Sequence, residues 1–173
     1  MRAALDDWAA PDAEQERLRR DFLARLDDGP EALRREGRPS HLTASAVVLD
    51  AAHTSVLLVL HAKTGLWLQP GGHVEQGDRS LAAAALREAV EETGIADLEL
   101  VDDRPVHLER HPAPCGAQSH LDVRFAVRAR VEAVPAVSDE SLDVAWFSLD
   151  ALPVQRCVDL ASLVRAAVRL PQP

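Results

Sequence analysis

Residues 71–95 read GGHVEQGDRSLAAAALREAVEETGI, and this stretch decides the fold. It begins with two glycines, which suit a loop whose backbone approaches another group closely. From about residue 80 to 93 the composition favours a helix, with Asp78 or Ser80 as the N-cap. Gly94 follows at the position where a glycine commonly ends a helix.

The helix within this stretch places three carboxylates on one face. At roughly 100° per residue from Glu88, Glu92 lies at about 40° and Glu91 at about −60°. We expect Ala84 and Ala85 to continue that face with small side chains that leave room for a ligand. Like charges at these spacings repel, and a divalent cation such as Mg²⁺ or Mn²⁺ would relieve the repulsion. The competing interpretation is a solvated acidic face of a purely structural domain.

These residues resemble the signature of the Nudix hydrolase family of MutT-like pyrophosphohydrolases, G-x5-E-x7-R-E-U-x-E-E-x-G-U, where U is aliphatic. The opening glycine falls on Gly72, and the second half of the signature matches residues 87–95 position for position. The first half differs, because its glutamate falls on Asp78 and eight residues instead of seven separate Asp78 from Arg87. We attribute the difference to one extra residue in the loop or first helical turn, where insertions are tolerated.

The resemblance implies an α/β (α+β) Nudix fold, in which a mixed β-sheet lies between helices. It assigns residues 39–173 to a Nudix hydrolase domain, with the signature over 72–95, and leaves 1–38 as an N-terminal helical extension. The residues themselves agree, since two β-branched and aliphatic stretches, His41–Leu49 and Thr54–His61, predict a hairpin. Further strands are expected at 66–68 and near 97–109, 120–132 and 144–148, and a last helix over about 156–169.

The N-terminal extension has an apolar stripe. Leu18, Phe22 and Leu26 recur every four residues, which predicts a helix with one buried face. That face is expected to pack on the main domain or on a second subunit. The family resemblance favours a homodimer.

The resemblance also implies a site for Mg²⁺ or Mn²⁺ whose ligands are the Gly71 carbonyl, Glu88, Glu91 and Glu92. Arg87 is implied to orient a glutamate through a charge-assisted hydrogen bond. Family members often draw one more acid from a later loop, and we expect Glu140 to take this place. The predicted catalytic set is therefore Glu91, Glu92, Arg87 and Glu140, with Glu91 and Glu140 as the alternatives for the base.

Three residues are predicted to contact the substrate. His73 and Glu75 belong to the glycine loop, and Arg124 shares one face of an expected strand with Arg128 and Arg130. The alternative for the three arginines is a solvated strand face.

A second group of possible ligands follows the signature. His107, His111, Cys115 and His120 make a zinc site conceivable, but their spacing is irregular. We therefore interpret residues 111–120 as a loop beside the substrate pocket.

The activity implied by the resemblance is divalent-metal-dependent hydrolysis of a phosphoanhydride bond in a small nucleotide, a nucleoside diphosphate linked to a further group. The alternative is a Nudix-fold module that senses nucleotides or binds a partner without turnover. Family members that act on diadenosine polyphosphates tend to carry a tyrosine after the signature, and this chain has no tyrosine.

Composition limits the partners. The net charge of −9 disfavours an extended nucleic acid, because phosphate neutralisation supplies most of that affinity. No apolar stretch approaches the roughly 20 residues of a membrane span, and the N-terminus has no apolar segment typical of a secretory signal. Two cysteines are too few for a disulfide framework, so we expect a cytoplasmic protein.

Overall fold

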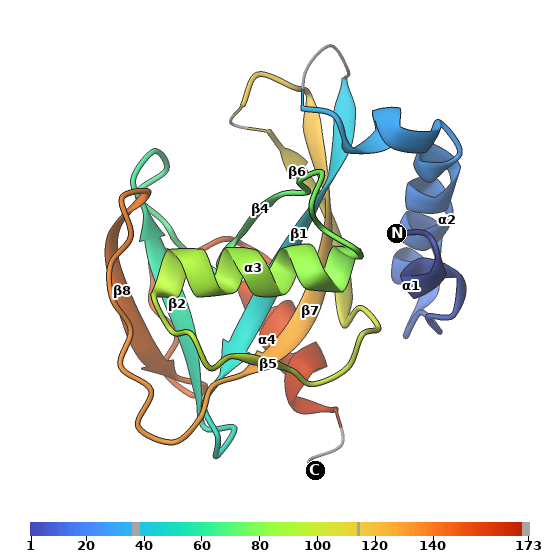
Figure 1. The fold of residues 1–173 in the computed structure, drawn as a ribbon. Coiled ribbons are helices and arrows are strands. Elements are labelled where there is room, and N and C mark those ends of the chain that lie inside the picture. Colours follow the sequence, from blue (N-terminus) through green and yellow to red (C-terminus); the bar gives the residue numbers. More distant parts are fainter. Residues whose placement is uncertain (36–38, 114, 171–173) are drawn as a thin grey trace.

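A mixed eight-stranded sheet forms the centre of the computed structural model, which describes residues 1–35, 39–113 and 115–170 (Figure 1). The main path runs β3–β2–β1–β7–β5, while β4 pairs with β1, β6 with β7 and β8 with β2. The sheet lies between helices, which confirms the expected fold class. Its strands are β1 (Ser40–Leu49), β2 (Ser55–His61), β3 (Trp67–Leu68), β4 (Gly71–His73), β5 (Glu99–Leu100), β6 (His107–Pro112), β7 (Ser119–Arg128) and β8 (Ser141–Ser148).

Strand β1 organises the sheet. It pairs antiparallel with β2 and β4 and parallel with β7. The predicted hairpin is confirmed, because Val48 of β1 lies opposite Leu57 of β2. Nearly all of β1 is buried, as expected for a strand that is covered on both faces.

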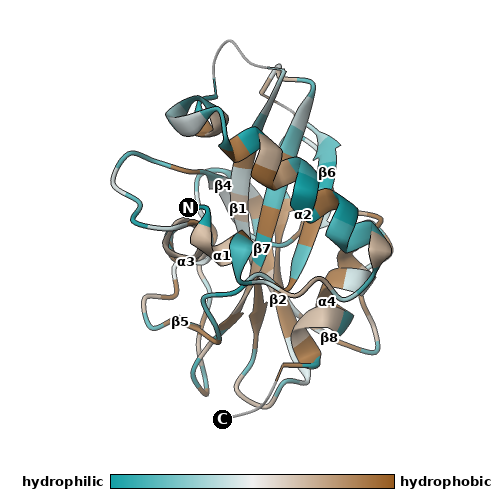
Figure 2. Cartoon of the chain, turned by 90° about the vertical axis from the view of Figure 1, so that its right-hand side faces the viewer, coloured by the Kyte–Doolittle hydropathy of each residue, from teal (hydrophilic) through white to brown (hydrophobic). Residues whose placement is uncertain are grey.

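Two helices cover opposite faces of the sheet, α3 (Leu81–Thr93) and α4 (Leu160–Val168) (Figures 1 and 2). Successive side chains of a strand point to opposite faces. Ala46 and Val48 accordingly join the apolar cluster beneath α3, whereas Val47 and Leu49 join the cluster beneath α4. One strand thus anchors both helix layers.

The N-terminal helices pack on the same chain. Leu18 and Phe22 are buried in the apolar cluster that also holds α3, and Leu26 packs against it. The Gln15 side chain donates to the Leu108 carbonyl at 3.0 Å and accepts from the Leu108 N–H at 2.8 Å, so it extends the pairing of β6. The region contains α1 (Ala3–Asp6), α2 (Ala13–Leu26) and a 3₁₀ helix, η1 (Gly29–Leu33).

Several expected elements have different bounds, including β7, which ends at Arg128 instead of 132, and β8, which begins at Ser141 instead of 144. The strand expected over 97–109 is two strands, β5 and β6, because the Arg104 N–H turns back to the Asp102 carboxylate at 2.9 Å and Pro105 has no N–H for a strand ladder. Helix α4 begins at Leu160, later than the expected 156. Within the described ranges, no helix is long and apolar enough to cross a membrane.

Candidate active site

Helix α3 begins and ends at residues that the sequence indicates. The Ser80 hydroxyl accepts the Ala83 N–H at 3.0 Å, so Ser80 is the N-cap and Asp78 is not. Gly94 ends the helix with φ of 68°. Ala84 and Ala85 are fully buried, which corrects the expectation that they leave room for a ligand. The first half of α3 packs against the sheet, and both methyl groups join the apolar core.

Arg87 is the centre of the site. Its Nη1 donates to Glu88 Oε1 at 3.1 Å and to Glu91 Oε2 at 2.9 Å, and its Nη2 donates to the His73 carbonyl at 2.9 Å. These charge-assisted bonds fix two carboxylates of α3 relative to the end of β4. The geometry agrees with the orienting role predicted for Arg87.

Asp78 supports Arg87 from the loop. Its two carboxylate oxygens accept from Arg87 Nε at 3.2 Å and Nη2 at 3.0 Å, and Oδ2 also accepts the Glu75 N–H at 2.8 Å. Burial would raise the pKa of Asp78, but the hydrogen bonds from Arg87 and Glu75 hold it below its usual value. The side chain is only 7% exposed, so Asp78 positions Arg87 and does not face a ligand.

Glu88 and Glu92 are half-buried carboxylates with few neutralising partners. Burial raises the pKa of Glu88 to about 7 despite the charge of Arg87, and Glu91 and Glu140 add to the rise. Burial and the neighbouring charge of Glu88 raise the pKa of Glu92 to about 8, against one hydrogen bond from the Gly71 N–H. Burial therefore outweighs the stabilisation of the ionised forms by Arg87 at Glu88 and by the Gly71 N–H at Glu92.

The two glycines of β4 allow close approach on both of its sides. A Cβ on Gly72 would lie 2.6 Å from Glu88 Oε1, and one on Gly71 would lie 2.2 Å from the Cβ and 2.6 Å from the Cα of Ser45. The Gly71 N–H donates to Glu92 Oε1 at 3.4 Å. Backbone and carboxylates can meet here because neither glycine has a side chain.

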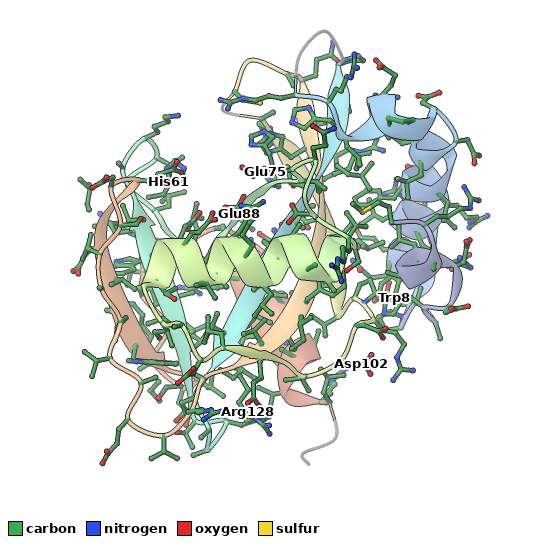
Figure 3. The ribbon with its side chains drawn as sticks, in the orientation of Figure 1. Trp8, His61, Glu75, Glu88, Asp102 and Arg128 are labelled. Carbon is green, nitrogen blue, oxygen red and sulfur yellow. The ribbon has the colours of Figure 1, made fainter. Side chains whose placement is uncertain are left out.

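The structure brings Glu140 to the same place from a distant part of the chain. Glu140 precedes β8, is exposed, and is close enough to raise the pKa of both Glu88 and Glu92. Glu91 is also open to solvent, with 57% of its side chain exposed. The four acids predicted for the site thus lie around one region of α3, with Glu75 on the same side (Figure 3).

Arg124, which the sequence predicts to contact the substrate, is buried, so it also does not fit the alternative of a solvated strand face. Its guanidinium is 2% exposed and pairs with Asp122 at 2.8 Å and with Asp159. Arg128 and Arg130 are more exposed and pair with Glu99 at 3.4 and 3.2 Å. The buried charge of Arg124 is already neutralised by two carboxylates, so this geometry gives no support to a substrate contact there.

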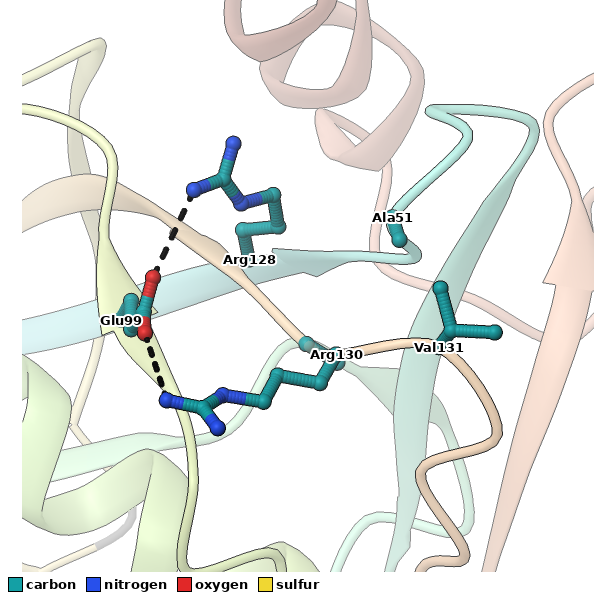
Figure 4. A pocket seen from close by; sticks show the side chains of 6 residues that line it. Ala51, Glu99, Arg128, Arg130 and Val131 are labelled. Carbon is teal, nitrogen blue, oxygen red and sulfur yellow. Dashed lines mark hydrogen bonds and ion pairs between the residues drawn. The ribbon is translucent and has the colours of Figure 1, made fainter. Parts of the chain in front are cut away.

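A shallow pocket of about 500 Å³ lies near Arg128, away from the carboxylates of α3 (Figures 3 and 4). Glu99 bridges the two arginines in its wall (Figure 4). Because these charges satisfy one another, the pocket adds nothing to the chemistry of the site.

The sequence reasoning missed a compact group of four ligand-type residues, the His/Cys cluster: His41, His73, Cys115 and His120. Parallel pairing of β1 and β7 places His41 beside His120, and no local spacing in the sequence indicates this. The weak signal was the short separation of Cys115 and His120. His107, which we had grouped with them, lies instead near Glu109 and Asp159.

A carboxylate-bearing helix beside a glycine loop on a mixed sheet defines a class of phosphoanhydride hydrolases. The family model of the NUDIX domain matches residues 39–166, well over half of the 173 residues, and the chain belongs to this family. It is a Nudix-type pyrophosphohydrolase, which acts on acid anhydride bonds in phosphorus-containing substrates.

Solved structures of the family have a similar fold. The Ap4A hydrolase of C. elegans has a TM-score of 0.61 and 23% identity, over 72% of this chain and 93% of that chain. The dihydroneopterin triphosphate pyrophosphohydrolase of E. coli has a TM-score of 0.61 and 20% identity, over 76% and 95%. An ADP-ribose pyrophosphatase from Streptococcus suis has a TM-score of 0.54 and 25% identity, over 75% and 92%.

Proposed function

We propose that this chain uses a divalent metal ion to hydrolyse a phosphoanhydride bond in a small nucleotide, a nucleoside diphosphate linked to a further group. The hydrogen-bond network of Arg87 carries the proposal, because it holds Glu88 and Glu91 beside the glycine strand that contacts Glu92. The similar structures include an Ap4A hydrolase, an ADP-ribose pyrophosphatase and a dihydroneopterin triphosphate pyrophosphohydrolase, and this supports a small phosphorylated substrate.

We propose Mg²⁺ or Mn²⁺ as the cofactor, held by the Gly71 carbonyl, Glu88, Glu91 and Glu92. The donor set fits such a hard cation, because all four groups offer oxygen. Burial and the neighbouring carboxylates raise the pKa values of Glu88 and Glu92, so a cation bound between them would stabilise their ionised forms. When bound, the ion would neutralise phosphate charge and lower the pKa of a water molecule.

The base is proposed to be Glu91 or Glu140, since both carboxylates are exposed and lie beside the buried pair. Either can accept a proton from the attacking water. Arg87 keeps Glu91 in position, whereas Glu140 comes from a different loop. The pH–rate profiles of Glu91→Gln and Glu140→Gln choose between them, because loss of the base removes the acidic limb of the profile.

His73 and Glu75 are proposed to contact the substrate. His73 ends β4, and Glu75 lies in the loop above α3 (Figure 3). Substitution of Glu75 is expected to raise KM more than it lowers kcat, because it removes none of the α3 carboxylates.

Phosphate release from a substrate panel tests the proposal. The panel contains nucleoside triphosphates, nucleotide sugars, ADP-ribose and dinucleotides, with Mg²⁺ or Mn²⁺ and an auxiliary phosphatase. Glu92→Gln is assayed beside wild type, and Glu99→Gln is the control because Glu99 is an exposed acid that pairs with Arg128 and Arg130. A substrate hydrolysed by wild type and the control, but not by Glu92→Gln, is the expected result. Equal hydrolysis by all three proteins would contradict it.

We also propose that residues 1–38 are a helical extension of a 39–173 domain, and that the protein acts as a cytoplasmic homodimer. Leu18 and Phe22 of the apolar stripe are buried within their own chain, so any dimer must use another surface. Light scattering after size-exclusion chromatography measures the oligomeric state directly.

A further inference from the structure

The His/Cys cluster lies at the end of the sheet beyond the glycine strand. His41 comes from β1, His73 from β4 and His120 from β7, and Cys115 lies in the loop between β6 and β7. His41 is fully buried, His120 is 7% exposed, and His73 and Cys115 are half-buried. Four segments that are far apart in the sequence therefore present ligand-type side chains to one point.

The ligand atoms of the His/Cys cluster are spaced as in a metal site. His73 Nε2 lies 3.1 Å from His41 Nε2, and Cys115 Sγ lies 3.2 Å from His120 Nε2 and 3.9 Å from His41 Nε2. One atom from each of the four residues lies within 4.8 Å of all the others. A tetrahedral Zn²⁺ with bonds of about 2.0–2.3 Å holds neighbouring ligand atoms roughly 3.3–3.6 Å apart, so small shifts suffice.

We propose that His41, His73, Cys115 and His120 form a structural Zn²⁺ site that ties the β6–β7 loop to strands β1 and β4. Three imidazoles and one thiolate are a donor set that closes a four-coordinate Zn²⁺ site and leaves no position for substrate on the metal itself, so His73 would meet a substrate only through the edge of its ring that faces away from the ion. The same donors disfavour Mg²⁺, which prefers oxygen. The proposal does not depend on the hydrolase activity, because none of the α3 carboxylates belongs to the cluster.

Electrostatics around the cluster are consistent with this ligand role. Burial lowers the pKa of His73 to about 4 and of His120 to about 3, so both rings are neutral and keep a free lone pair at pH 7. Arg35 lies close enough to lower the pKa of His41 and His73, and its charge disfavours a cation. The Cys115 thiolate would supply the compensating negative charge. Among the described residues Nδ1 of His41 has no hydrogen-bond partner, so the polar contacts of that ring are made by Nε2, which faces His73 and Cys115.

A metal here would stiffen the wall of the active site. His73 offers its ring to the cluster and its carbonyl to Arg87 Nη2 at 2.9 Å. Cross-linking the ring therefore fixes the backbone that Arg87 contacts. Without the metal, weak contacts of the Cys115 sulfur hold its loop to His41 and His120.

Metal retention tests the proposal on full-length protein made without a histidine tag. Metal-free, reduced protein receives one equivalent of Zn²⁺ and passes a desalting column in excess Mg²⁺. We expect one Zn²⁺ per chain in wild type, in Glu92→Gln and in the matched control Cys157→Ser, and none in Cys115→Ser. Co²⁺ in place of Zn²⁺ should show a thiolate charge-transfer band that Cys115→Ser abolishes. Retention in Cys115→Ser, or loss in Glu92→Gln, would overturn the proposal.

Alkylation of the wild-type protein gives a second test, which does not depend on whether a variant folds. The two cysteines are resolved by mass spectrometry after exposure to a thiol reagent with and without Zn²⁺. Zn²⁺ should slow modification of Cys115 at least about ten-fold and leave Cys157 unchanged, because a coordinated thiolate is a poorer nucleophile. Equal rates at Cys115 with and without the metal would contradict a bond between them.

Discussion

The carboxylates of α3 and the His/Cys cluster adjoin the two ends of one short strand, β4, yet they arise in different ways. Glu88, Glu91 and Glu92 come from two turns of a single helix, and Gly71 meets Glu92. The His/Cys cluster comes from four segments that meet only when the sheet forms. A site built within one helix can be predicted from spacing, and a site built by strand pairing cannot.

Burial favours the neutral form of the side chains in both groups, so it shifts the pKa values of the carboxylates and of the imidazoles in opposite directions. It raises the pKa of Glu88 and Glu92, so the acids tend to keep a proton. It lowers the pKa of His73 and His120, so these bases tend to lose one. The donor atoms support the two proposals separately, because oxygen ligands suit hard cations such as Mg²⁺, whereas nitrogen and sulfur ligands suit Zn²⁺.

The largest expected effect is on kcat, and it distinguishes the α3 carboxylates from the His/Cys cluster. Glu92→Gln should lower kcat by at least about 100-fold, because it removes charge that holds the catalytic metal. Zn²⁺ retention by the His/Cys cluster should not change. Steady-state kinetics and metal analysis of the same sample measure both. A near-normal kcat would remove Glu92 from the active site.

Substitution of the paired glycines probes the strand that the two groups share. Gly72→Ala should cost activity at least about ten-fold with little loss of stability, because its Cβ would displace the flexible end of Glu88. Gly71→Ala should lower the unfolding free energy by about 1–3 kcal/mol, because its Cβ meets the backbone of Ser45. Kinetics and denaturant unfolding of both variants are compared. The opposite pattern would show that Gly72 does not face Glu88.

Asp78→Ala should have a smaller effect, about ten-fold on kcat, because Asp78 acts by positioning Arg87. Asp78→Asn keeps an acceptor for one of the two bonds and should recover part of the loss. A loss from Asp78→Ala as severe as that from Glu92→Gln would place Asp78 among the metal ligands.

The smallest expected effect is on the pH dependence of the unfolding free energy of the metal-free protein. Glu88 and Glu92 have folded-state pKa values of about 7 and about 8, above the ordinary 4.5. The folded state therefore binds more protons, and their contribution to stability is present below pH 4.5 and is lost as the pH rises through about 8.

Denaturant unfolding from pH 5 to about 8.5 measures this loss, which should be smaller in Glu92→Gln. Mg²⁺ should restore stability at the alkaline end, because it binds the ionised carboxylates. An equal slope in both proteins would contradict the raised pKa of Glu92.

Features formed by residues that are close together in the sequence can be predicted from it. The hairpin, the caps of α3 and the charge cluster of its exposed face follow from periodicity and from Ser80, Gly94 and the glutamates. Glu140 was also predicted beside the cluster, by family resemblance, and the structure brings it there.

Features formed by contacts between distant segments of the chain could not be predicted in this way. The sequence predicts that Arg124 contacts the substrate, or else a solvated strand face, because strand alternation does not show which face a second layer covers. Arg124 is instead buried and paired with Asp122 and with Asp159 of a later segment. His41 and His120 lie side by side through the parallel pairing of β1 and β7, which has no signal in either strand alone.

Hydrolysis is proposed to depend on a metal ion held by the α3 carboxylates. Titration of Mn²⁺ followed by electron paramagnetic resonance, with turnover recorded in the same samples of wild type, Glu92→Gln and Glu99→Gln, tests this dependence. Occupancy and turnover should rise together in wild type and Glu99→Gln, and both should be lost in Glu92→Gln. Mn²⁺ binding and turnover that Glu92→Gln leaves unchanged would contradict the account.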